Sequence, residues 1–270
     1  MRRALAAIVG LGLAAASGVA PAHEATATDD AGLALAASQA AIGRVVDDLE
    51  FRDGMGARFR LADLRGRPVI LSPIYTSCGH TCPLLTATLA RAVQAAEDVV
   101  GPGRFTVLTV GFDVANDTPA RMAAYGRRHG AGFADWRFVT AETAAIAGLL
   151  DDIGLVVRPV AGGFDHVAQV TLIDGQGRVV RQVYGDDFQP PAVVDPLLDL
   201  VLRGSAQASF VAGLIDRVTL FCTVYDPATG AYRFDYALFV ELAVGGLSIL
   251  AVGGFLWREA RRRADSARGA

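Results

Sequence analysis

Two cysteines, Cys78 and Cys82, are the residues best placed to do chemistry in this chain. They stand four apart in the stretch 76–83, TSCGHTCP, directly after a buried apolar run, VILSPIY. At such a strand-to-helix junction the two side chains share one face of the first helical turn, where unpaired N–H groups favour the thiolate. The pair can close a disulfide or offer two soft thiolates to a metal. A purely structural disulfide is disfavoured, because it would staple almost no loop.

A histidine, His166, precedes the predicted strand 167–173, where the chain is expected to approach the cysteines. Two thiolates and one imidazole suit Cu(I), and with added ligands they can hold Cu(II). The alternative is an ordinary half-buried loop histidine. Asp165 either orients this ring or serves as a turn residue. The spacing C-x-x-x-C and the absence of proline before 167–173 differ from the usual thioredoxin-type pattern. Copper binding and dithiol exchange by Cys78 and Cys82 both remain open, as does turnover as a reductase.

The elements that must position these residues follow from hydrophobic periodicity. An Asp53-Gly54 turn joins two short strands, and the turn 174–177 joins the last two strands as a hairpin. Thr118 caps a helix that has Pro119 in its first position. The alternation of strands and helices predicts an α/β fold, with a thioredoxin-like central sheet flanked by helices. The predicted strands are 69–75, 105–112, 136–139, 167–173 and 179–184, and the predicted helices are 83–97, 143–152, 192–202 and one from residue 119.

Three motifs together resemble the SCO/SenC family of membrane-tethered, thioredoxin-like copper proteins. They are C-G-H-T-C-P after a strand, Asp113 with Asp117-Thr118-Pro119 after the next strand, and Asp165-His166 before V-x-L-I-D-x-x-G-R. The resemblance covers about residues 45–202, and it departs from the family where Gly79-His80 replace the common Pro-Asp. It implies copper bound by Cys78, Cys82 and His166.

The resemblance also implies a client. Copper would be delivered to the binuclear copper site of cytochrome c oxidase subunit II, or the thiols of that site would be reduced. Other periplasmic copper chaperones or thiol reductases are candidate further partners. The competing hypothesis is a thiol-disulfide oxidoreductase that acts on exported proteins without copper. Nucleic acid is not an expected partner, since the formal net charge of the 270 residues is −3.

The two ends of the chain predict export and membrane attachment. Residues 1–22 have a basic start, a short apolar run and a small-residue cleavage site, as a signal peptide does. Residues 237–257 are apolar over a length that can span a bilayer, and basic residues follow. We therefore expect a single-pass protein of the bacterial inner membrane, with its main domain on the periplasmic side. The expected divisions are a signal peptide at 1–22, a linker at 23–43, a thioredoxin-like SCO domain at 44–204, a juxtamembrane segment at 205–236, a transmembrane helix at 237–257 and a cytoplasmic tail at 258–270.

Overall fold

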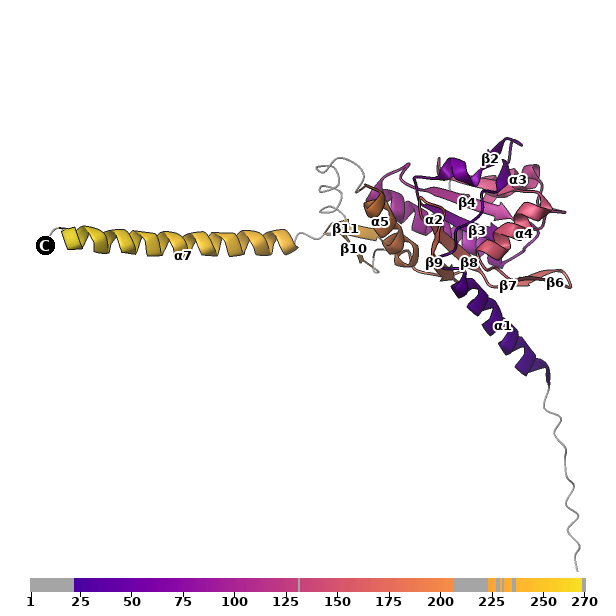
Figure 1. Cartoon of the computed structure of the whole chain (residues 1–270), viewed down its shortest axis with the longest axis horizontal. Helices are drawn as coiled ribbons and strands as arrows, with labels where there is room; N and C mark the ends of the chain where they lie inside the picture. Colours follow the sequence, from indigo (N-terminus) through magenta and orange to yellow (C-terminus); the bar gives the residue numbers. More distant parts are fainter. Residues whose placement is uncertain are drawn as a thin grey trace, which may run out of the picture.

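A seven-stranded sheet forms the centre of the computed structural model, which describes residues 22–130, 132–205, 223–226, 229, 231–234 and 237–268. The strand order is β2-β1-β5-β4-β3-β8-β9, and Figure 1 labels β2, β4, β3, β8 and β9 of this sheet. Strands β3, β4 and β5 are parallel, whereas β8 runs antiparallel to β3 and β9 antiparallel to β8. The strands are β1 (Glu50–Asp53), β2 (Arg58–Arg60), β3 (Val69–Ile74), β4 (Thr106–Gly111), β5 (Trp136–Thr140), β8 (Gln169–Ile173) and β9 (Val179–Tyr184).

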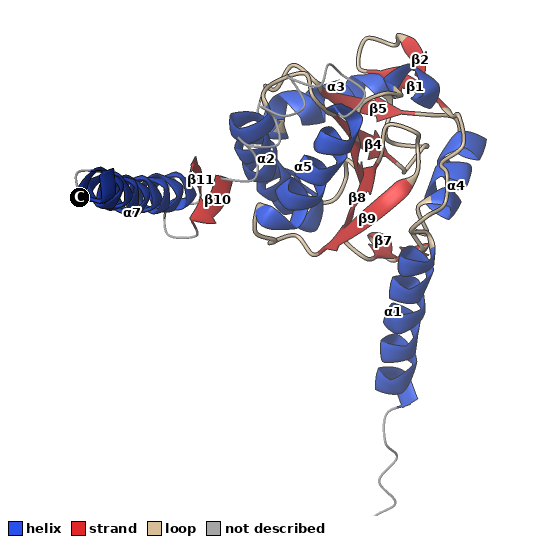
Figure 2. Ribbon diagram, turned by 60° about the vertical axis from the view of Figure 1, so that its left-hand side comes forward, coloured by secondary structure: helices blue, strands red, loops and turns tan. Residues whose placement is uncertain are grey.

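Helices cover both faces of this sheet (Figure 2). Every residue of β3 and β4 is buried, as expected for parallel strands between two helical layers. Ile70 packs in one core cluster with side chains of α2 and α5, while its neighbour Leu71 packs in another with side chains of α3 and α4. The predicted α/β class with a helix-flanked sheet is confirmed. The helices are α2 (Thr81–Val100), α3 (Pro119–His129), α4 (Thr143–Asp152) and α5 (Pro191–Ser205).

Local side-chain contacts explain several of the element boundaries. Thr118 Oγ1 accepts a hydrogen bond from the Arg121 N–H (3.3 Å), and Pro119 opens α3, so the predicted helix start is confirmed. The Asp174 carboxylate accepts from the N–H groups of Gln176 and Arg178, which closes the predicted hairpin turn between β8 and β9. These turns depend only on residues close in sequence.

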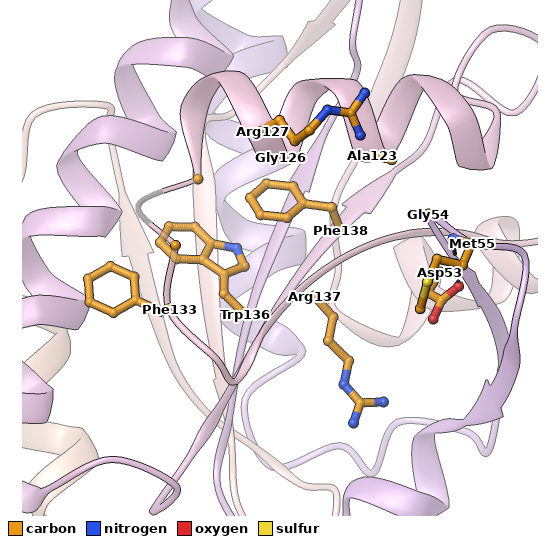
Figure 3. A pocket seen from close by; sticks show the side chains of 12 residues that line it. Asp53, Gly54, Met55, Ala123, Gly126, Arg127, Phe133, Trp136, Arg137 and Phe138 are labelled. Atoms are coloured by element: carbon orange, nitrogen blue, oxygen red, sulfur yellow. Dashed lines mark hydrogen bonds between the residues drawn. The ribbon is translucent and has the colours of Figure 1, made fainter.

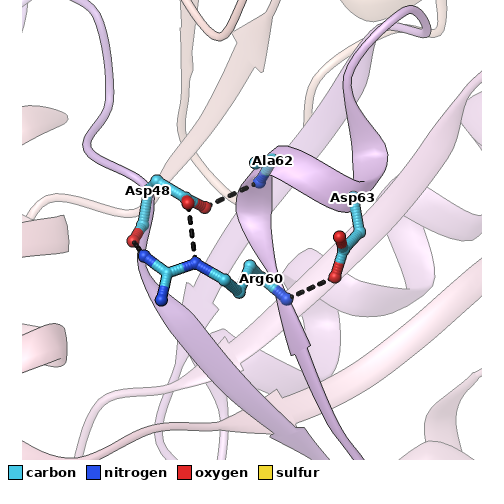
Figure 4. A network of polar contacts seen from close by, with 4 residues as sticks. All are labelled: Asp48, Arg60, Ala62 and Asp63. Carbon is cyan, nitrogen blue, oxygen red and sulfur yellow. Dashed lines mark hydrogen bonds and ion pairs between the residues drawn. The ribbon is translucent and has the colours of Figure 1, made fainter.

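A polar network fastens the edge strand β2 and the short 3₁₀ helix η1 (Leu61–Leu64) to the preceding loop (Figure 4). The Asp48 carboxylate accepts from the Ala62 N–H (2.9 Å) and from Arg60 Nε (2.6 Å), and the Arg60 N–H donates to Asp63 (2.8 Å). These hydrogen bonds, led by that of Ala62, hold the pKa of Asp48 below its usual value. The charged carboxylate therefore helps to define this edge.

The predicted linker at 23–43 is wrong for most of its length, because residues Ala22–Ala40 form helix α1. Small residues at helical spacing, Ala34, Ser38 and Ala41, are buried against the domain. Ser38 Oγ donates to Gln169 Oε1 (2.7 Å) and pairs with the Tyr184 hydroxyl (2.8 Å). The folded unit therefore begins before residue 44.

The C-terminal part contains a hairpin, β10 (Thr223–Asp226) and β11 (Ala231–Phe234), followed by helix α7 (Ala237–Arg268). The Tyr232 hydroxyl donates to Asp195 Oδ1 (2.7 Å), which ties the hairpin to α5. Much of the predicted juxtamembrane segment 205–236, and all of the predicted signal peptide except Ala22, lie outside the described residues.

The membrane crossing predicted at 237–257 is not supported. Within the described ranges, no helix combines the length and the apolar character that crossing a membrane requires. Helix α7 also continues without a break through residues 258–268, so no structural boundary separates the predicted span from the predicted tail.

Candidate metal and dithiol centre

The two cysteines meet where β3 passes into α2. The Cys78 N–H donates to the Tyr75 carbonyl (3.1 Å), which turns the chain back after the strand. Cys82 lies in the first turn of α2, and its N–H donates to Cys78 Sγ (3.3 Å). The Cys78 sulfur therefore occupies the acceptor position that a capping side chain fills at other helix starts. Cys82 thus lies on the first helical turn as predicted, whereas Cys78 lies in the loop just before the N-cap His80, and the hydrogen bond joins the two across this junction.

The thiol loop is anchored from behind by Asp117, in the loop between β4 and α3. Asp117 is fully buried. Its Oδ1 accepts from the N–H (2.8 Å) and the hydroxyl (2.6 Å) of Thr76, and its Oδ2 accepts from the Asp113 N–H (2.9 Å). Burial raises the pKa of this carboxyl, although the three hydrogen bonds oppose that effect. The Asp117-Thr118-Pro119 motif thus positions the loop that carries Cys78 and begins α3.

The two thiols differ in exposure and acidity. Cys78 is partly exposed. Burial opposes its ionisation, but the hydrogen bond from the Cys82 N–H, together with the nearby His80 N–H, Cys82 thiol and Tyr75 hydroxyl, lowers its pKa. Cys82 is 1% exposed, and burial raises the pKa of its thiol, with Cys78 beside it adding to the effect. Cys78 is therefore the sulfur suited to attack a disulfide or to meet a metal first.

His166 ends β7 (Gly163–His166), which pairs with β6 (Val157–Val160) in a hairpin separate from the main sheet. The ring is half-buried, and burial lowers its pKa, so the neutral form is favoured. Nδ1 lies 3.0 Å from the Val167 carbonyl. A carbonyl can only accept, so this hydrogen bond places the proton on Nδ1 and leaves the lone pair on Nε2. Val167, and not the exposed Asp165, therefore provides this ring contact.

Aromatic rings pack against the imidazole beside the thiols. His166 packs edge-on against Phe112 (5.1 Å between centroids) and Tyr75 (6.0 Å), and Phe164 contacts both of those rings. Cys78 and Cys82 pack in the same cluster. Among the described residues, no three His, Cys, Asp or Glu side chains are close enough together to hold a metal ion. In this conformation the predicted ligands therefore border one region without closing into a metal site.

Sequence reasoning missed the residues that surround this centre. By sequence, Tyr75 is only the last residue of a predicted buried strand, and Phe112 and Phe164 have no evident role beside His166. A signal exists for Tyr75 and Phe112, since each directly follows one of the parallel strands β3 and β4 and so lies at the same sheet edge. Phe164 lies in β7, outside that sheet, and has no such signal. The side chain of His80 is exposed, as expected for a solvated loop histidine.

Two hollows lie near the sheet. One of about 400 Å³ is lined by His166, Asp165, Arg158 and residues of α1, so the imidazole borders a cleft. The other, of about 560 Å³, lies between α3 and β5 (Figure 3). It is walled by the stacked rings of Phe133, Trp136 and Phe138, and none of the predicted site residues lines it.

Comparison with known proteins bears on the whole domain. The sequence model of the SCO1/SenC family matches residues 38–201. A search of curated proteins finds no significant match. One similar solved structure is that of a protein of Aquifex aeolicus VF5 provisionally assigned to electron transfer. Its sequence is 26% identical to this chain, and the match covers 63% of this chain and 98% of the Aquifex chain, with a TM-score of 0.53.

Two more distant structures share the fold. Arabidopsis thaliana ScoI with copper bound is 17% identical, covers 59% of this chain and 99% of its own, and has a TM-score of 0.52. BsSco, a member of the Sco family of cytochrome c oxidase assembly proteins with a disulfide switch, is 20% identical, with coverage of 61% and 95% and a TM-score of 0.52. The thioredoxin-like fold predicted from the sequence is the one that these proteins have.

Proposed function

The chain belongs to the SCO1/SenC family, and on that premise we propose that it binds copper through Cys78, Cys82 and His166. The observation that carries the proposal is the hydrogen bond from the Cys82 N–H to the Cys78 sulfur, which brings the two cysteines together at the start of α2, beside a hairpin whose imidazole keeps a lone pair on Nε2. Two thiolates and a neutral imidazole are ligands that Cu(I) prefers, and Cu(II) accepts the same set with added ligands. ScoI of Arabidopsis thaliana, with the same fold, is a copper-bound protein.

Copper binding requires the imidazole to turn. The rings of Tyr75 and Phe112 contact the imidazole of His166, so this ring must turn before Nε2 can reach a metal on the sulfurs. The imidazole also lines a cleft of about 400 Å³, which leaves it space to turn while the hairpin stays in place. Each sulfur releases its proton as it binds the metal, and for buried Cys82 the positive ion replaces the proton that burial favours.

We further propose that the cargo is passed to the binuclear copper site of cytochrome c oxidase subunit II. A three-coordinate Cu(I) leaves room for an incoming thiolate, so the ion can move through shared-ligand intermediates. BsSco is named as an assembly protein of this oxidase. The location proposed is the periplasmic side of the inner membrane, on the basis of the basic start and small-residue site of residues 1–22. Protection of the domain from protease in intact spheroplasts would contradict that location.

Dithiol exchange is the second candidate function, favoured by the asymmetry of the thiols. The partly exposed Cys78 has a lowered pKa and can attack a client disulfide, forming a mixed disulfide and releasing one client thiolate. Cys82 then loses its proton and attacks Cys78, which releases the second client thiolate. The client gains two electrons, and the protein is left with a Cys78–Cys82 disulfide. This reaction needs no imidazole.

Copper titration of the reduced full chain tests the proposal. We expect about one Cu(I) per chain, no tight binding in Cys78→Ser or Cys82→Ser, and about a ten- to hundredfold weaker affinity in His166→Ala, because losing a ligand or its support typically costs that much. His129→Ala, which removes an imidazole at the end of α3, is the matched control and should bind as the wild type does. Unchanged affinity in His166→Ala, with full reductase activity toward a client disulfide, would favour dithiol exchange instead.

A further inference from the structure

Tyr75 contacts both halves of the candidate centre. It lies directly after β3 and three residues before Cys78, and its side chain is buried. Its ring packs edge-on against Phe164 (5.2 Å between centroids) and His166 (6.0 Å), both in β7. The approach of β7 is close, since a Cβ added to Gly163 would lie 2.9 Å from the Tyr75 hydroxyl oxygen. Tyr75 therefore fills the space between the thiol loop and the histidine hairpin.

The hydroxyl of Tyr75 faces both sides of the same space. Burial is the main reason that the pKa of Tyr75 is raised; the Cys78 sulfur adds to the rise and the Phe164 N–H opposes it, so both groups lie beside this hydroxyl. One hydroxyl can accept from an N–H and donate to a sulfur at once, because it has one proton and two lone pairs. The Tyr75 oxygen thus lies between the backbone of β7 and the more exposed of the two thiols.

The hairpin that carries His166 depends on such contacts. β6 and β7 pair with each other and with no strand of the seven-stranded sheet that the structure describes. A two-stranded hairpin on its own is marginally stable in water, so its position is set by what it packs against. Arg158 on β6 forms an exposed ion pair with Asp30 of α1 (3.0 Å), which adds little. The buried contacts with Tyr75 and Phe112 are the stronger hold.

We propose that Tyr75 is a positioning residue, which holds the His166-bearing hairpin at the thiol pair so that the imidazole can join a metal bound by Cys78 and Cys82. The inference rests on the proposed copper-binding function. Tyr75 is not itself a ligand in this scheme; it acts through its hydroxyl, which lies between β7 and Cys78, and through its ring, which supports His166.

A double-mutant cycle of Tyr75→Phe and His166→Ala tests this role. Tyr75→Phe keeps the ring and removes only the hydroxyl. We expect it to weaken Cu(I) affinity about three- to tenfold, the effect of one buried hydrogen bond. In the His166→Ala background the same change should have less than about a twofold effect, because no imidazole remains to be positioned. The thiolate-to-Cu(II) charge-transfer band should shift in Tyr75→Phe and should not shift further when His166 is also replaced.

Two further variants control for a general loss of structure. Gly163→Ala pushes a methyl group toward the Tyr75 hydroxyl and should lower copper affinity without altering Tyr75. Tyr125→Phe removes another buried hydroxyl of the same core, which pairs with Thr86 (3.0 Å), and should leave affinity unchanged. An equal loss from Tyr75→Phe in both backgrounds, or no loss at all, would overturn the positioning role alone. If His166→Ala by itself has no effect on affinity, the ligand role of His166 fails, and the positioning role fails with it.

Discussion

Replacing Asp117 by alanine should loosen the thiol loop and lower the stability of the whole domain. The carboxylate is fully buried and is the acceptor for two N–H groups and one hydroxyl, those of Thr76 and Asp113. Alanine leaves these three donors without an acceptor in a place that water does not reach. Each buried donor without an acceptor costs about 1–3 kcal/mol, so the three donors together cost about 3 kcal/mol even at the low end of this range.

One effect opposes this loss. Burial raises the pKa of Asp117, so the native protein stabilises the charged carboxylate less well than water does, and alanine relieves that cost. We therefore expect a net loss of about 2–4 kcal/mol in the free energy of unfolding. Asp117→Asn keeps one acceptor oxygen but turns an amide group toward the Asp113 N–H, and should cost about 1–2 kcal/mol. Thr76→Val removes only the hydroxyl bond and should cost about 1 kcal/mol.

Urea unfolding of the three reduced, metal-free variants measures these changes in the free energy of unfolding. Each change is calculated from the shift of the urea midpoint, provided that the slope (the m-value) equals that of the wild type. The rate of Cys78 alkylation in native buffer should rise in the order Thr76→Val, Asp117→Asn, Asp117→Ala, since Thr76 lies two residues before Cys78. If Asp117→Ala is no more destabilising than Thr76→Val, the carboxylate is not the anchor of the loop and the reasoning is refuted.

Three further predictions concern the thiols, the imidazole and the core. Iodoacetamide at neutral pH should alkylate Cys78 in Cys82→Ser at least about tenfold faster than Cys82 in Cys78→Ser; similar rates would contradict the asymmetry. Burial lowers the pKa of His166, so the neutral ring stabilises the metal-free protein above about pH 6.5, and this contribution is lost as the pH falls through the lowered pKa. Urea titrations between about pH 7 and 5 should therefore show a flatter decline for His166→Gln than for wild type, and parallel declines would disprove it. Leu89→Ala in α2 should cost about 3 kcal/mol by urea unfolding, unless the cavity collapses.

The parts of the fold that sequence reasoning predicted depend on neighbours in the chain. The apolar run before Cys78 indicates a buried strand, and Thr118-Pro119 indicates a helix start. Both are decided within a few residues, and both are found in the structure. The spacing of the cysteines correctly places Cys82 on the first turn of α2, while Cys78 lies in the loop before that turn. The edge at which His166 arrives also followed from the order of strands.

The parts that were missed depend on contacts between distant segments. Helix α1 has weak local signals, and its small residues are explained only by the β8 and β9 side chains that Ser38 meets. The β6–β7 hairpin contains Pro159 and ends at His166, so the pattern resembled a loop. In the sequence, Tyr75 has the pattern of an ordinary strand residue, and only its contacts with Phe164 and His166 of β7 reveal its place in the centre. The position of the imidazole relative to the sulfurs likewise could not be predicted from the sequence, because it depends on the packing of rings from three separate elements.

The antiparallel pairing of β8 with β3 has a consequence for how the protein matures. His166 reaches the cysteine edge only after β8 has paired with β3. Among the described residues, four strands (β4 to β7) and three helices (α2 to α4) lie between those two strands in the order of the chain. A folding chain therefore exposes its dithiol well before the imidazole can arrive. During that interval the sulfurs are open to oxidants and to any soft metal, and only the completed sheet brings the imidazole to their edge.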